Sequence, residues 1–238
     1  MKKVYLGTDL RENNVYWELF NNNSLAITGL SGTGKSYLCN SVINIFIENK
    51  YEVIIISSKA RVDFKQEVQK IRPLEDKEEL KAFIEKMNSL ISTSKTEVEN
   101  SEFTHLNKIR EQKILIVIDE LWETEKLEKQ LKKEFLELIE LSLRQLRYLS
   151  INLILLSQSF KVSETTLPFK MVKIIISSKT DTAEASEAIF GTDVAHKTNL
   201  KAGQFICWDR KSKYKIITLK PEKISLFKRI WKLLSNKK

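Results

Sequence analysis

The chain has 238 residues, of which 42% are hydrophobic and 30% are charged, and its formal net charge is +9. This composition excludes an intrinsically disordered chain and predicts a soluble fold with one substantial core, or one core plus a small appendage. No apolar stretch reaches the length of a membrane span, and the N-terminus lacks the apolar core of a signal peptide, so we expect a cytoplasmic protein. The two isolated cysteines, Cys39 and Cys207, suit a reducing compartment.

The excess of positive charge has two possible explanations. A polyanionic partner such as nucleic acid gains affinity for a basic protein by releasing counterions. General solubility with a basic tail explains the same charge, and composition does not separate the two.

The N-terminal part predicts a short strand at residues 4–7, a polar turn at 12–14 and a second apolar segment at 15–17. The apolar run at 25–28 predicts a strand, and a helix follows over 35–49. The expected buried stripe of this helix consists of Leu38, Val42, Ile45 and Phe46.

Between that strand and that helix, residues 29–36 read Gly-Leu-Ser-Gly-Thr-Gly-Lys-Ser. This matches the phosphate-binding pattern G-x-x-x-x-G-K-[ST] in its required strand–loop–helix context. Glycines let backbone N–H groups turn inward, and the helix N-terminus adds a positive dipole end. Lys35 is expected to reach the β- and γ-phosphates, and Ser36 to bind Mg²⁺. The predicted nucleotide-binding residues are Gly29, Ser31, Gly32, Thr33, Gly34, Lys35, Ser36 and Tyr37.

The continuous apolar run at 53–56 predicts a strand buried on both faces of a parallel sheet. Residues 60–112 are polar and are expected to be mostly helical, with an interruption at Pro73. Their periodic apolar face consists of Leu80, Phe83, Ile84 and Met87. The polar stretch at 92–102 predicts a mobile loop.

The next apolar strand, at 114–118, ends in two acids. Asp119 is expected to bind Mg²⁺, and Glu120 to orient and deprotonate the attacking water. GTPase switches usually lack the second acid, so the pair indicates an ATPase with ATP as its nucleotide.

A long amphipathic helix is expected over 123–149. Its inner side consists of Leu127, Leu131, Phe135, Leu138, Ile139, Ser142, Leu143 and Leu146. Apolar strands follow at 151–156 and 172–176, and the segments 204–208 and 214–218 predict a C-terminal hairpin. Strands that alternate with helices predict an α/β fold whose sheet is mainly parallel, with helices on both faces.

Gln158 follows the strand at 151–156, where the carboxyl ends of strands face the ligand crevice. It is a candidate sensor of the γ-phosphate; a solvent-facing residue at the strand end is the alternative. Arg144 and Arg147 near the end of the preceding helix fit either an arginine finger or a cation that offsets the helix dipole.

In chain order these segments resemble the motor domain of the FtsK/SpoIIIE DNA translocases, within the wider FtsK–HerA group of P-loop ATPases. The resemblance rests on residues 7–9 and 29–36, on the acidic strand at 117–121, on the arginine–strand–glutamine segment at 147–158, and on residues 177–181, 188–191 and 202–204. It covers nearly the whole chain.

The resemblance implies a RecA-like fold, a hexameric ring and ATP-driven movement along double-stranded DNA. By position it implies that Lys35 and Ser36 bind phosphate and Mg²⁺, that Asp119 binds Mg²⁺, that Glu120 is the base and that Gln158 is the sensor. We expect no counterpart to the family's membrane-anchoring part and winged-helix module among these residues. Arginines that often follow a methionine in the family are replaced after Met87 by Asn-Ser-Leu.

We expect residues 1–222 to form the motor domain and residues 223–238 a basic amphipathic helix. Three interpretations of that helix stay open: packing on the sheet or on a neighbouring subunit, contact with an anionic membrane, and contact with DNA phosphates.

Three functions are consistent with the sequence. The first is a DNA translocase. The second is a genome-packaging or conjugative coupling motor of the same fold, with a capsid portal, a relaxase or a membrane channel as partner. The third is an ATP-gated assembly protein that moves no DNA, against which the Asp119-Glu120 pair argues, since a scaffold needs no hydrolytic base.

Overall fold

A single mixed sheet organises the molecule. The computed structural model describes residues 1–19, 22–57, 68–71, 75–99, 113–120, 126–149, 151–157, 171–210 and 213–219. Within these ranges ten strands form one sheet in the order β2-β1-β10-β9-β8-β3-β7-β6-β4-β5. Their bounds are β1 Lys3–Asp9, β2 Asn14–Glu18, β3 Ser24–Thr28, β4 Glu52–Ser57, β5 Gln69–Ile71, β6 Ile114–Asp119, β7 Ile151–Ser157, β8 Ile174–Ser177, β9 Gln204–Trp208 and β10 Lys215–Thr218.

The sheet is parallel from β8 to β5 and antiparallel from β8 to β2. The parallel half is the one predicted from the continuous apolar runs, and the α/β fold class is confirmed. The predicted C-terminal hairpin is β9–β10, and it pairs with the N-terminal hairpin β1–β2 through β1 and β10. Both ends of the described chain therefore complete the same sheet.

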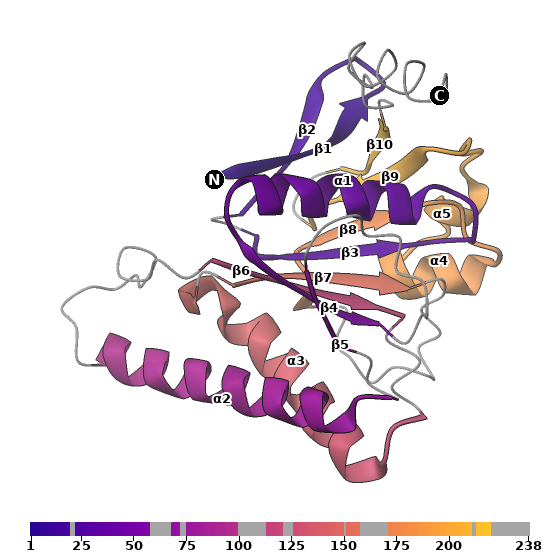
Figure 1. Ribbon diagram of the computed structural model, residues 1–238. Helices are drawn as coiled ribbons and strands as arrows, with labels where there is room; N and C mark the ends of the chain where they lie inside the picture. Colours follow the sequence, from indigo (N-terminus) through magenta and orange to yellow (C-terminus); the bar gives the residue numbers. More distant parts are fainter. Residues whose placement is uncertain are drawn as a thin grey trace, which may run out of the picture.

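Helices cover the two faces of the parallel strands. Figure 1 shows α1 along one face and the pair α2 and α3 along the other. The helix bounds are α1 Lys35–Glu48, α2 Lys77–Glu99, α3 Lys129–Leu149, α4 Ala183–Phe190 and α5 Val194–Lys197.

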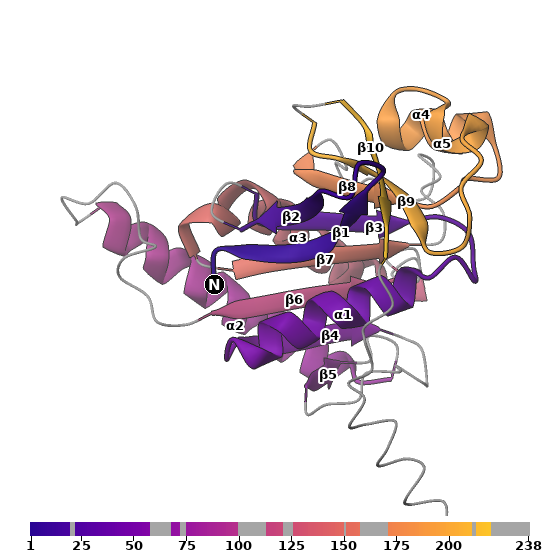
Figure 2. The same ribbon diagram turned by 90° about the horizontal axis from the view of Figure 1, so that it is seen from above.

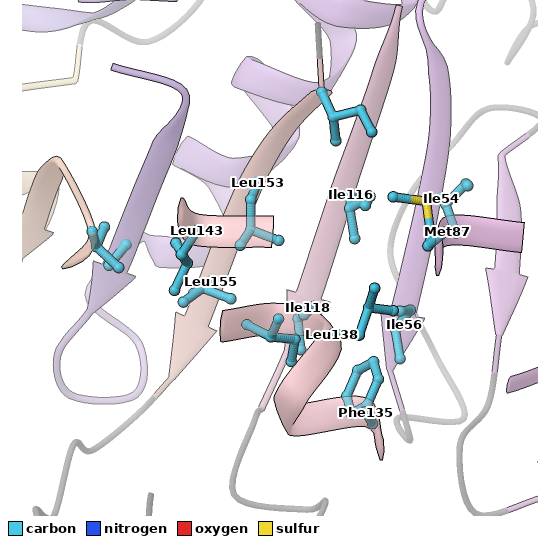
Figure 3. Close-up of a cluster of buried hydrophobic side chains, with 14 of the residues drawn as sticks. Ile54, Ile56, Met87, Ile116, Ile118, Phe135, Leu138, Leu143, Leu153 and Leu155 are labelled. Atoms are coloured by element: carbon cyan, nitrogen blue, oxygen red, sulfur yellow. The ribbon is translucent and has the colours of Figure 1, made fainter. Parts of the chain in front are cut away.

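Alternation along each strand divides the core into two clusters. In β4, Ile54 and Ile56 pack with α2 and α3, whereas Val53 and Ile55 pack with α1. Figure 3 shows the first cluster, in which Phe135 of α3 lies beside Ile56. Each fully buried Ile or Phe side chain contributes about 1.5–3 kcal/mol to folding, so the central strands are held firmly from both sides.

The β1–β2 hairpin continues the sheet beyond β10 and lies on the α1 side of the central strands, as Figure 1 shows; Figure 2 gives the view from above. Trp17 of β2 is fully buried, and its ring centroid lies 5.6 Å from that of Phe46 in α1. The predicted stripe of α1 is confirmed for Leu38, Val42 and Phe46, whereas Ile45 is only half-buried. α1, which follows the phosphate-binding motif, is thus packed between the hairpin and the central strands.

Three expectations for the middle of the chain are wrong. The polar stretch expected to be a loop is helical as far as Glu99, because α2 continues beyond Ile91, which packs in the core, into a polar segment without Gly or Pro. The strand β5 lies in the segment expected to be helical, at the edge of the sheet beside β4. α3 begins at Lys129 rather than near 123, and Leu127 is buried ahead of it. Pro73, residues 100–112 and the C-terminal segment 223–238 lie outside the described residues.

None of the described helices is long and apolar enough to span a bilayer.

The two cysteines lie in the core and are not joined in a disulfide. Cys39 of α1 and Cys207 of β9 are both buried. Burial raises the pKa of the Cys207 thiol to about 12, because a thiolate would lose its hydration there.

We therefore expect neither cysteine of the native protein to react with a thiol-specific reagent such as DTNB, because reaction requires an exposed thiolate. The measurement is the absorbance change in buffer compared with that in guanidinium chloride, where both thiols should react. Rapid release of one equivalent from native protein would contradict the buried positions.

Candidate functional site

The phosphate-binding motif forms a loop between β3 and α1. It leaves the sheet at Gly29, whose φ is +120°. A Cβ at this position would lie 1.8 Å from Ser178 Oγ. The segment after β8 lies this close because Ser178 N–H donates to Thr28 O at 3.0 Å. Glycine is required at position 29 for both its backbone angle and the approach of Ser178.

Hydrogen bonds within the loop fix its curvature. Leu30 O accepts from Thr33 Oγ1 at 2.8 Å and from Lys35 Nζ at 2.6 Å. The ammonium of Lys35, whose residue is only 9% exposed, is thereby held against the loop backbone. From outside, Gly203 N–H donates to Thr33 O at 3.1 Å, and this contact ties the loop to the start of β9.

The two acids lie at the carboxyl end of β6, next to the loop. Asp119 is the last residue of that strand and is paired in register with Ser57 of β4 and Leu156 of β7. Glu120 has left the strand: its φ is +62° and its N–H donates to Leu156 O at 3.0 Å. Glu120 is 4% exposed, so its carboxylate is held in the protein rather than in solvent.

A left-handed backbone conformation at glutamate costs about 1–2 kcal/mol. Such strain concentrates at functional sites, where the surrounding structure enforces it. At Glu120 the hydrogen bond to the neighbouring strand β7 supplies part of that enforcement.

The loop and the acids enclose one cavity of about 310 Å³. Its lining residues are Ser31, Gly32, Gly34, Lys35, Ser36, Tyr37, Asp119, Glu120, Leu156 and Ser157. The Lys35 ammonium and the α1 N-terminus attract a polyphosphate, whereas the two carboxylates repel it unless a cation lies between. A nucleoside triphosphate with Mg²⁺ fits this donor set, since Mg²⁺ prefers carboxylate, hydroxyl and phosphate oxygens.

The structure brings together most of the residues predicted for the site. Gly29 and Thr33 do not line the cavity; they shape and anchor the loop. Gln158 lies outside the described residues, so its expected sensor role stays a prediction.

The arginines lie at the opposite end of the sheet from the cavity. Arg147 is in the last turn of α3, and Arg144 pairs with Glu140 on the same helix. α3 leads into the first residue of β7, and the last residue of β7, Ser157, lines the cavity. The length of β7 separates the two ends by about 20 Å. A role of either arginine as a finger at a neighbouring subunit's site remains a proposal.

Sequence reasoning assigned no role to three contributors to the site: Ser57, Ser157 and Gly203. Ser57 and Ser157 end the strands β4 and β7, and polar residues at the carboxyl ends of parallel strands are a usable signal. Gly203 has no such signal, because its contact with the loop depends on how β9 returns to the sheet.

A model of the NTPase family matches residues 24–166, which include the loop and both acids. The chain belongs to the NTPase family. No curated protein sequence matches it significantly.

Solved structures show the same fold as this NTPase at low sequence identity. The pCW3 conjugation coupling protein TcpA, solved with ATPγS, has a TM-score of 0.78 and 16% identity, over 98% of this chain and 70% of that one. The cytoplasmic domain of the type VII secretion ATPase EccC of Thermomonospora curvata has a TM-score of 0.76 and 16% identity, over 98% of this chain and 31% of that one. B204, the DNA-packaging ATPase of Sulfolobus turreted icosahedral virus, has a TM-score of 0.57 and 20% identity, over 84% of this chain and 98% of that one.

We expect Gly29→Ala to lower the free energy of unfolding by about 3 kcal/mol, because backbone strain and a clash with Ser178 add together. Gly191→Ala is the matched control: Gly191 has a φ of +72° and no atom within 4 Å of the added Cβ. It should lose only about 1 kcal/mol. The measurement is urea unfolding of both variants, and equal losses would contradict the close packing at Gly29.

Proposed function

We propose that this NTPase is an ATP-hydrolysing motor that moves double-stranded DNA through an oligomeric ring. The observation that carries the proposal is the buried carboxylate of Glu120, which lines the same cavity as Asp119 and the phosphate-binding loop. A protein that only binds nucleotide has no need of a second, buried acid there.

Different residues of the site bind phosphate, bind the metal and activate water. The loop N–H groups and Lys35 hold the β- and γ-phosphates, and Ser36 and Asp119 would hold Mg²⁺. Glu120 orients a water and accepts its proton as the water oxygen bonds to the γ-phosphorus and the bond to the bridging oxygen of ADP breaks. Mg²⁺, when bound, neutralises negative charge on the phosphate oxygens. Lys35 stabilises charge that develops toward the leaving ADP.

DNA as the substrate is supported by charge and by resemblance. The formal net charge of +9 favours a polyanion. The FtsK–HerA resemblance implies a hexameric ring with DNA in its channel, and in such a ring Arg147 or Arg144 would act on a neighbour's nucleotide. Within this proposal residues 1–222 are the motor domain, and Gln158 senses the γ-phosphate.

A genome-packaging or conjugative coupling motor is the alternative, and it fits about equally well. The fold comparison spans 98% of B204, a packaging ATPase, so nearly all of that protein's chain has a counterpart here. This function requires a partner such as a capsid portal, a relaxase or a membrane channel. Activity that depends on such a partner would favour it over an autonomous translocase.

We expect Glu120→Gln to bind ATP with normal affinity and to hydrolyse it about 10²–10⁴-fold more slowly, because a general base contributes that much. Glu12→Gln is the control, since Glu12 has a similar φ of +64° but lies in the exposed β1–β2 turn. Lys35→Ala, by contrast, should weaken nucleotide binding itself. The measurements are steady-state phosphate release, which reports turnover, and the Kd of a fluorescent ATP analogue, which reports binding. Wild-type turnover by Glu120→Gln would refute the assignment of the base.

We also expect linear double-stranded DNA to stimulate ATP hydrolysis, and the stimulation to fall steeply with salt as counterion release becomes less favourable. The measurement is the ATPase rate across a salt series with duplex DNA, single-stranded DNA or no DNA. A rate that no DNA changes at any salt concentration, in the absence of other partners, would contradict an autonomous translocase.

A further inference from the structure

We infer that Ser57 is a positioning residue that holds the metal-binding carboxylate of Asp119. Ser57 is the last residue of β4, and its Oγ–H donates to Asp119 Oδ2 at 3.2 Å. The inference rests on the proposed function, because it assigns a role to Ser57 through the carboxylate expected to hold Mg²⁺.

The sheet itself brings the two side chains together. Ser57 and Asp119 are Cα partners in the parallel pairing of β4 with β6, so their side chains point to the same face. Two residues earlier in each strand, Ile55 and Val117 pack with α1. Ser57 and Asp119 therefore project toward the side of the sheet on which α1 and the phosphate-binding loop lie.

Burial makes this contact matter. Ser57 is 3% exposed, so its hydroxyl has little access to water as an alternative partner. A hydrogen bond from this hydroxyl restricts rotation of the carboxylate that accepts it. Loss of such a supporting partner typically weakens metal affinity about 10–100-fold, because the ligand is then no longer oriented in advance.

The experiment measures metal binding directly, by electron paramagnetic resonance of Mn²⁺ titrated into protein that is saturated with a non-hydrolysable ATP analogue. We expect Ser57→Ala to raise the Kd for Mn²⁺ about 10-fold or more. The metal-free affinity for the nucleotide analogue should not change. Ser57→Thr keeps the hydroxyl and should restore most of the Mn²⁺ affinity.

Ser24→Ala is the matched control for loss of a buried hydroxyl. Ser24 is 1% exposed, and its Oγ accepts from Lys173 N–H at 3.1 Å. It begins β3, at the end of the sheet away from the cavity, so Ser24→Ala should leave Mn²⁺ binding unchanged.

A double-mutant cycle with Asp119→Ala separates positioning from general damage to the fold. In the Asp119→Ala background, Ser57→Ala should have no further effect on Mn²⁺ affinity. An equal loss in both backgrounds, or wild-type affinity in Ser57→Ala, would overturn the inference about Ser57 alone. Absence of nucleotide-dependent Mn²⁺ binding by the wild-type protein would instead overturn the proposed metal site together with the inference. Failure of the protein to move DNA would contradict the proposed motor function but would not change the Mn²⁺ titrations in either background.

Discussion

The register of the parallel strands is the constraint on which the site depends. β4, β6 and β7 end at one edge of the sheet, and their pairing aligns Ser57 with Asp119 and Asp119 with Leu156. Because side chains alternate between faces, a slip of one residue in β6 would turn Asp119 away from the loop and toward α2 and α3. The two core clusters prevent this slip, since it would also exchange every isoleucine of that strand between the faces.

The site combines this rigid edge with two unfavourable local features. Glu120 adopts a left-handed backbone, and two carboxylates lie beside a loop built for phosphate. The strain is small compared with the hydrophobic burial in the adjacent strands. In the proposed site, repulsion between the carboxylates and phosphate would make tight binding of a triphosphate depend on a divalent cation. The same arrangement thus links nucleotide binding, metal binding and the presence of a buried base.

Much of this arrangement could be predicted from the sequence. The phosphate-binding motif and the acids that end an apolar strand are local signals, so the sequence alone predicts one site for Lys35, Ser36, Asp119 and Glu120. The strand β5 and the full length of α2 were not predicted, because short edge strands and polar helix ends carry no apolar periodicity. The contacts of Ser57 and Gly203 with the site depend on pairing between distant segments, which periodicity does not encode.

The central claim is that the loop and the paired acids form one catalytic site for a nucleoside triphosphate. A crystal structure of this NTPase with Mg²⁺ and ATPγS tests it most directly. We expect the β- and γ-phosphates to lie on the loop, Mg²⁺ to contact Ser36 and to be bound by Asp119 directly or through water, and a water to lie between Glu120 and the γ-phosphorus. Nucleotide bound away from the loop, or Glu120 directed away from the γ-phosphate, would contradict it.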